Sequence, residues 1–247
     1  MPDRGELLVY SDPDALARAV ADVFVATARI AIAERGVFRV ALSGGNTPRA
    51  AYELLAKQAP ATDLEWRRVF VYFGDERCVA PADQRSNYRM AREAFLDAVA
   101  IPSENVRRIR GEIDPPQAAR AYAAQLREDA GESPQLDLVL LGLGPDGHTA
   151  SLFPGTPPDT DDDALVRAVY AESQAMWRVT ITPKVINAAR AVAFAVEGSE
   201  KAAILAAVYE GPLDPMRYPA QIVRPASGRL MWLVDESAAA LLRDFTV

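Results

Sequence analysis

The chain is poor in several features, and each shortage excludes a class of protein. It has a single cysteine, Cys78, so an intrachain disulfide is impossible and a reducing compartment is favoured. No apolar run is as long as a membrane span, and Met1-Pro-Asp-Arg-Gly-Glu is too polar to begin a signal peptide. From these absences we expect a cytoplasmic protein that does not contact a membrane.

Basic residues are fewer than acidic ones. Lys and Arg number 27, Asp and Glu number 34, and the formal net charge is −7 at pH 7. This balance argues against non-specific nucleic-acid binding but permits a local basic pocket for an anionic metabolite. The 247 residues are 50% hydrophobic and show no repeat or low-complexity linker. We therefore expect one domain over residues 1–247, and no feature indicates an obligate protein partner.

Histidine occurs once, as His148 in Leu141-Gly-Leu-Gly-Pro-Asp-Gly-His-Thr-Ala. With one copy, any histidine that acts as a general base must be His148, and a metal-ligand cluster is not visible. A loop histidine can simply cap the next short helix. Three glycines (Gly142, Gly144 and Gly147) and a preceding apolar run favour a functional role, because open α/β sheets place their chemistry at strand ends.

Apolar runs of strand length alternate with longer amphipathic segments. We expect strands at residues 37–42, 69–73, 136–141, 191–196 and 230–234. We expect helices at 13–34, 47–57, 86–100, 116–129, 199–209 and 236–242. Near-continuous apolarity indicates strands covered on both faces, so the pattern predicts a Rossmann-like, doubly wound α/β fold with a mainly parallel sheet and helices on both faces. The acidic, proline-rich segment 155–163 is predicted as a loop, and the sequence does not decide whether it is a lid over the site.

Ser43-Gly-Gly-Asn-Thr-Pro follows the strand expected at 37–42 and opens a helix. Two glycines let the backbone turn and present N–H groups at the positive end of the helix dipole, which favours a bound anion such as phosphate. The spacing matches neither a Walker loop nor a dinucleotide fingerprint. A tight turn with a simple helix cap is the alternative.

Two further strand-end loops carry polar groups. In Gly74-Asp-Glu-Arg, Arg77 can grip a phosphate with paired hydrogen bonds, while Asp75 and Glu76 are candidate hydroxyl acceptors or bases. In the histidine loop, Asp146 can orient the imidazole, and the N–H groups of Gly144 and Gly147 are candidates to hold an oxyanion.

Two other basic residues are candidate phosphate ligands. Arg178 lies in an expected strand, Trp177-Arg-Val-Thr-Ile-Thr. Lys201 lies near a helix start, where a cation is mildly unfavourable unless an anion is near. An exposed basic residue without a ligand is the alternative at each position.

Taken together, these motifs resemble those of 6-phosphogluconolactonases. The resemblance rests on Ser43-Gly-Gly-Asn-Thr-Pro, Gly74-Asp-Glu-Arg, Ser86-Asn-Tyr-Arg-Met, Gly142-Leu-Gly-Pro-Asp-Gly-His-Thr-Ala-Ser-Leu-Phe-Pro, Arg178-Val-Thr-Ile-Thr, Gly198-Ser-Glu-Lys-Ala and Pro219-Ala-Gln-Ile-Val, which occur in the family's order. It covers nearly the whole chain, and the His148 motif is its most specific part.

The resemblance implies hydrolysis of 6-phospho-D-glucono-1,5-lactone to 6-phospho-D-gluconate in the oxidative pentose phosphate pathway. It also implies the fold of the glucosamine-6-phosphate isomerases and the absence of any metal or organic cofactor. His148 becomes the catalytic base, with Asp146 beside it. The implied contacts to the phosphorylated sugar lactone are Ser43, Gly44, Gly45, Thr47, Asp75, Arg77, Arg178 and Lys201.

Three alternatives stay open. The first is an aldose–ketose isomerase or deaminase on the same fold. The resembling isomerases have a glutamate five residues after the histidine, and here that position is Phe153. A phenyl ring suits a His148 that stays mostly neutral, because a nearby carboxylate would favour its protonation. The second is a Cys78–His148 thiol hydrolase, and the third is a sugar-phosphate sensor with a decayed site.

Overall fold

A six-stranded parallel sheet is the centre of the computed structural model, which describes residues 4–155 and 163–243. The strand order is β1-β9-β8-β5-β2-β3. The strands are β1 (Glu6–Tyr10), β2 (Phe38–Leu42), β3 (Val69–Phe73), β5 (Leu138–Leu141), β8 (Ala191–Val196) and β9 (Arg229–Asp235). Every residue of β5 and β8 is buried, as expected for strands covered on both faces.

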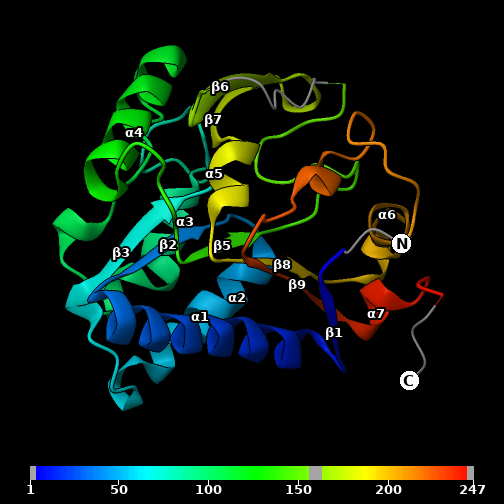
Figure 1. Cartoon of the computed structure of the whole chain (residues 1–247), viewed down its shortest axis with the longest axis horizontal. Coiled ribbons are helices and arrows are strands. Elements are labelled where there is room, and N and C mark those ends of the chain that lie inside the picture. The colour runs from blue at the N-terminus through cyan, green and yellow to red at the C-terminus, as the bar shows by residue number, and fades with distance from the viewer. Residues whose placement is uncertain (1–3, 156–162, 244–247) are drawn as a thin grey trace.

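Helices flank this sheet, as the sequence predicts, and the α/β prediction is confirmed (Figure 1). They are α1 (Pro13–Arg35), α2 (Asn46–Gln58), α3 (Asn87–Ala94), α4 (Pro115–Ala130), α5 (Pro183–Ala188), α6 (Ala202–Tyr209) and α7 (Glu236–Ala239). In Figure 1, α1 and α2 lie on one side of the strands and α4 and α5 on the other. No helix among the described residues is long and apolar enough to cross a membrane.

A second, three-stranded antiparallel sheet joins β4 (Asp75–Arg77), β7 (Met176–Ile181) and β6 (Val166–Ala171) in that order. Sequence analysis expected only β7, through the strand around Arg178. The edge strand β1 and helix α5 were missed as well. β4 has only three residues, all charged, so its strand conformation comes from pairing with β7 rather than from local apolarity.

The predicted helix at 86–100 is too long. Helix α3 ends at Ala94, and Phe95 adopts an extended φ of −149° before a short 3₁₀ turn at Leu96–Ala98. The Phe95 side chain is fully buried, with its ring centroid 5.8 Å from that of Phe24 and 5.6 Å from that of Trp66. Packing of this ring in the core therefore overrides the local helical pattern.

The connections reverse direction between β2 and β5, which are neighbours in the sheet. From β2 the chain continues to β3 on one side, and from β5 it continues to β8 on the other. Such a reversal leaves a crevice at the carboxyl ends of the two strands, where open α/β sheets bind ligands. Ser43 follows β2 and Gly142 follows β5, so the fold brings two of the predicted motifs to this crevice. Residues 156–162 of the predicted acidic loop lie outside the described residues.

Candidate active site

The loop after β5 pairs the only histidine with a carboxylate. The Oδ1 atom of Asp146 lies 2.5 Å from Nδ1 of His148 and accepts the His148 backbone N–H at 3.1 Å. An ionised carboxylate only accepts hydrogen bonds, so we assign the ring proton to Nδ1. This tautomer leaves Nε2 as a proton acceptor. The His148 side chain is 21% exposed, so the ring is sheltered and still reachable.

The Asp146 carboxyl group is held in its ionised form. Burial raises the pKa of Asp146. The charge of His148 and the hydrogen bonds from the His148 backbone and ring lower it by more, so the pKa lies below its usual value. Asp146 is therefore a carboxylate at neutral pH. It can orient the imidazole and stabilise the positive charge that the ring acquires on taking a proton.

The glycines of this loop shape it around the ring. A Cβ atom on Gly144 would lie 2.1 Å from Nδ1 of His148, and Gly147 has a φ of +83°, which disfavours other residues. Their N–H groups are already engaged: that of Gly144 donates to the His148 carbonyl at 2.8 Å, and that of Gly147 donates to the Gly144 carbonyl at 3.1 Å. The predicted oxyanion role of these two N–H groups is therefore not supported.

Phe153 lies against the histidine. Its ring centroid is 4.9 Å from that of His148, with the two planes tilted by 51°. Phe153 stands where the resembling isomerases have a glutamate, so no carboxylate comes from this position. The carboxylate beside the ring is that of Asp146, two residues before the histidine, as the sequence predicted.

A cavity of about 420 Å³ lies at the crevice between β2, β5 and β8. It is lined by the carboxyl end of β8 and by the segments that follow β2, β5 and β8: Gly44, Gly45, Asn46, Thr47, Pro48, Gly142, Leu143, Ala195, Val196, Glu197, Gly198, Glu200 and Lys201. The structure thus brings together four predicted ligand residues, Gly44, Gly45, Thr47 and Lys201.

Two features of this cavity favour an anion. The first N–H groups of any helix lack an intrahelical partner, and at helix α2, which begins after Gly45, no side chain of the described residues caps them. These N–H groups can therefore bind an anion. Lys201 reaches in from the 3₁₀ turn Ser199–Lys201, and its Nζ donates to the Leu143 carbonyl at 2.9 Å. The Tyr52 hydroxyl fixes the Ser43 backbone: it accepts the Ser43 N–H and donates to the Ser43 carbonyl, each at 3.1 Å.

Asp75 does not have the free carboxylate that the sequence suggested. It is 6% exposed, and its Oδ2 accepts the Ser151 hydroxyl at 2.6 Å, with NH1 of Arg178 at 3.4 Å. Its Oδ1 accepts the Asn87 side-chain amide at 3.1 Å. Burial lowers the pKa of Arg178, and the Asp75 charge opposes that shift. The Asp75 carboxylate is therefore engaged by Ser151, Asn87 and Arg178.

Glu76 is a helix cap rather than a base. Its two oxygens accept the N–H groups of Asn87 and Tyr88, at 2.7 and 2.8 Å, and the Ser86 hydroxyl at 2.9 Å. Burial raises the pKa of Glu76 despite these bonds. The candidate role of Glu76 as a hydroxyl acceptor or base is not supported, because its acceptor positions are occupied at the start of α3.

Arg77 and Arg178 face each other across β4 and β7. One Arg77 NH group donates to the Arg85 carbonyl at 2.5 Å, while NH2 of Arg178 donates to the side chain of Gln174. The Nε atoms of both arginines are buried and have no hydrogen-bond partner within the described part of the chain. Neither arginine lines the cavity that holds Lys201. Their phosphate-binding role stays a prediction.

The cysteine alternative loses its chemical basis. Burial, followed by the charge of Glu76, raises the pKa of Cys78 to about 11. The thiol is therefore protonated at neutral pH and is a poor nucleophile. The cavity beside it is lined by Trp177 and Tyr170 and does not include His148.

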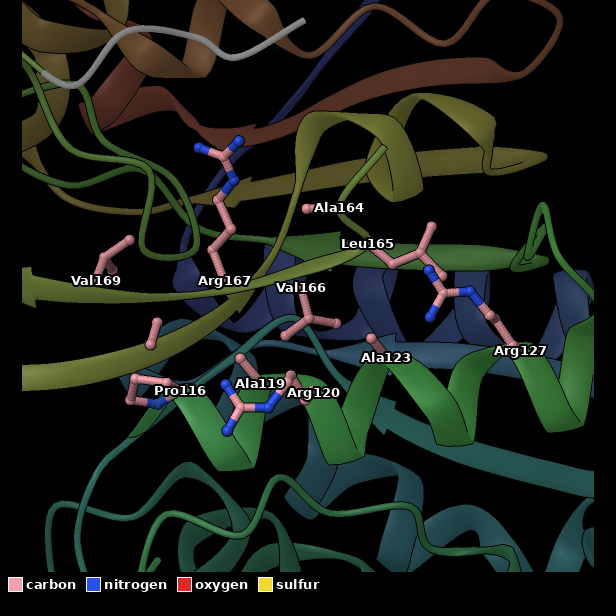
Figure 2. A pocket seen from close by; sticks show the side chains of 11 residues that line it. Pro116, Ala119, Arg120, Ala123, Arg127, Ala164, Leu165, Val166, Arg167 and Val169 are labelled. Atoms are coloured by element: carbon pink, nitrogen blue, oxygen red, sulfur yellow. The ribbon is translucent and has the colours of Figure 1, made fainter. Parts of the chain in front are cut away.

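The structure has a larger cavity that holds none of the predicted site residues. This cavity, of about 540 Å³, lies between α4 and β6 (Figure 2). Its floor is made of small and apolar residues, and the guanidinium groups of Arg120, Arg127 and Arg167 lie at separate places along it in Figure 2. It contains no acid–base pair. Across residues 4–155 and 163–243, no group of three or more His, Cys, Asp or Glu side chains is arranged to hold a metal ion.

Comparison with known proteins identifies relatives across nearly the whole chain. The model of the glucosamine-6-phosphate isomerases/6-phosphogluconolactonase family matches residues 11–232. A 6-phosphogluconolactonase from Synechocystis sp. is 46% identical over 218 residues, which cover 86% of this chain and 88% of the relative. The human 6-phosphogluconolactonase is 37% identical over 246 residues, covering 98% and 95%.

Solved structures agree with these sequence matches. The 6-phosphogluconolactonase from Trypanosoma brucei has a TM-score of 0.85 and 29% identity, covering 97% of this chain and 99% of that one. A monomeric glucosamine-6-phosphate deaminase has a TM-score of 0.83 at 19% identity, covering 96% and 99%. At that identity the deaminase shows a shared fold only.

Proposed function

The chain belongs to the glucosamine-6-phosphate isomerases/6-phosphogluconolactonase family, and we propose that within it the chain acts as a lactonase. The family recognised from the sequence is confirmed, and with it the assignment of the chain as an enzyme. The proposed reaction is hydrolysis of 6-phospho-D-glucono-1,5-lactone to 6-phospho-D-gluconate, a step of the oxidative pentose phosphate pathway. The observation that carries this proposal is the His148–Asp146 pair at the carboxyl end of β5.

His148 supplies the acid–base chemistry. Its Nε2 takes a proton from a water molecule as the water oxygen attacks the lactone carbonyl carbon. When the tetrahedral intermediate collapses, the bond between that carbon and the ring oxygen breaks, and the imidazolium returns the proton to the ring oxygen. Asp146 holds the ring through Nδ1 and stabilises the transient imidazolium. A lactone is already a reactive ester, so no covalent nucleophile is needed.

The cavity at the switch between β2 and β5 supplies the grip on the substrate. We assign the phosphate to the open N-terminus of α2 and to Lys201, which together provide N–H donors and a positive charge. Binding the phosphate at a distance from the ester fixes the position of the carbonyl relative to His148. Arg77 and Arg178 are proposed as additional cationic contacts.

The direct test is hydrolysis of freshly prepared 6-phosphogluconolactone, with spontaneous ring opening subtracted. We expect rapid formation of 6-phosphogluconate by the wild-type protein. In parallel, glucosamine 6-phosphate tests the isomerase alternative through ammonia release. The site offers one imidazole with Phe153 beside it where the resembling isomerases have a glutamate, so we expect no ammonia. Ammonia release at comparable efficiency would overturn the lactonase proposal and leave the fold unaffected.

A further inference from the structure

A buried polar cluster links the three strand-end loops of the site. Its members are Asp75 on β4, Arg178 on β7, Asn87 at the start of α3 and Ser151 in the histidine loop, and each is 6% exposed or less. We propose that Ser151 is a positioning residue, which fixes the His148 loop through Asp75. This inference rests on the lactonase function proposed above.

Ser151 is the only member of the cluster that comes from the histidine loop. Its hydroxyl donates to Asp75 Oδ2 at 2.6 Å, a short charge-assisted bond, and its N–H donates to the Thr180 hydroxyl at 3.2 Å. These two bonds attach the segment three residues after His148 to both β4 and β7. On the other side of the histidine, Asp146 is 43% exposed, and among the described residues its side chain bonds only to His148. The two hydrogen bonds of Ser151 therefore hold the His148 loop in place against the three-stranded sheet.

Asp75 extends the link to the phosphate-binding side. The Asn87 amide donates both to the Asp75 carboxylate at 3.1 Å and to the Asp75 carbonyl at 2.9 Å. That same side chain lies against Gly44, where a Cβ atom would be 1.9 Å from Oδ1 of Asn87. Through Ser151, Asp75 and Asn87, the loop that carries His148 is thus joined to Gly44 in the loop that opens α2.

Such a cluster fixes a geometry because every member is buried and has a partner. The Oδ2 atom of Asp75 accepts the Ser151 hydroxyl and also lies 3.4 Å from NH1 of Arg178, so both groups stabilise its negative charge. Removing the hydroxyl leaves Asp75 bound to Arg178 and Asn87 but frees the histidine loop from β4. The expected defect is therefore in the placement of His148 rather than in the binding of phosphate.

The test compares Ser151→Ala with a matched control, Thr182→Val. Thr182 is 4% exposed, and its hydroxyl donates to the Ala164 carbonyl at 2.8 Å, outside the cluster. Each variant loses one hydrogen bond donated by the hydroxyl of a buried residue. For Ser151→Ala we expect kcat to fall on the order of 10- to 100-fold, since small misplacements of catalytic groups have effects of this size. KM for the lactone and all parameters of Thr182→Val should change by less than about twofold.

A second readout does not depend on activity. His148 is the only histidine, so protein labelled with ¹⁵N-histidine gives one imidazole spectrum. We expect Ser151→Ala to shift or broaden this signal, Ser151→Thr to restore it in part, and Thr182→Val to leave it unchanged. An unchanged spectrum in Ser151→Ala, an equal fall of kcat in both variants, or a change confined to KM would each overturn the positioning role. If the wild-type protein hydrolyses no lactone, the proposed function fails, and the histidine spectrum still decides the role of Ser151.

Discussion

Replacing His148 with asparagine is the perturbation that most directly tests the proposed chemistry. The described part of the chain offers no second group that could act as the base. Glu76 accepts three backbone N–H groups and a hydroxyl, and Asp75 accepts from three buried side chains. Asp146 remains near the substrate, but its pKa is held below the usual value while the histidine is present, and a carboxylate is a weak base. Loss of a positioned general base costs about 100- to 10,000-fold in rate. This corresponds to roughly 3–5 kcal/mol of transition-state stabilisation.

The assay measures acid release from fresh lactone over pH 5–9, with the spontaneous rate subtracted at each pH. Because His148 is 21% exposed at the surface of a loop, we expect the variant to keep the urea midpoint and circular dichroism spectrum of the wild type. The wild-type protein should show a pH dependence of kcat/KM that His148→Asn lacks. Near-native activity of His148→Asn with the same pH profile would refute the assignment.

Three further predictions follow from the same site. Lys201→Ala should weaken binding of the phosphorylated lactone by about 1.5–3 kcal/mol, roughly 10- to 150-fold, and should affect unphosphorylated glucono-1,5-lactone far less, which inhibition or KM measurements on both compounds can check. Cys78→Ser should retain full activity, and alkylation of Cys78 should accelerate with pH up to about 11, where its raised pKa places the thiolate; rapid alkylation at pH 7 would contradict this. Dialysis against a chelator should leave activity unchanged, and a loss that zinc restores would refute a mechanism that relies on His148 alone.

The sequence predicted the strand-end loops of the candidate site but not the partners of their polar residues. The strand-end loops at Ser43, Gly74 and Gly142 were identifiable because glycines follow buried apolar runs, and the doubly wound topology brings such ends together. Phe95 shows the limit of local pattern: the sequence after α3 remains helix-compatible, and burial of this ring against three other aromatic rings ends the helix. Strand β4 could not be predicted for a similar reason, since its three charged residues form a strand only by pairing with β7.

Sequence analysis included Asn87 and Ser151 in the family motifs but predicted no role for either. Neither carries a charge or an unusual local pattern, and their importance comes from partners 12 and 76 residues away along the chain. Contacts at such separations cannot be read from periodicity or capping rules. The glycine at position 44 was one available signal, because a glycine that precedes a helix sometimes marks a close approach by another side chain, here the Asn87 amide.

The three carboxylates near the strand ends show how structure separates residues that look equivalent in sequence. Asp75, Glu76 and Asp146 were all candidates for acid–base or hydroxyl-binding roles. Glu76 uses both oxygens to cap α3, and Asp75 uses both to join buried groups, so neither has an oxygen available for substrate without breaking protein contacts. Asp146 is 43% exposed, and its described side-chain hydrogen bonds go to His148 alone. The three carboxylates therefore differ in which hydrogen bonds they already accept, not in residue type. Asp146 is placed to orient His148, whereas Asp75 and Glu76 hold parts of the protein together.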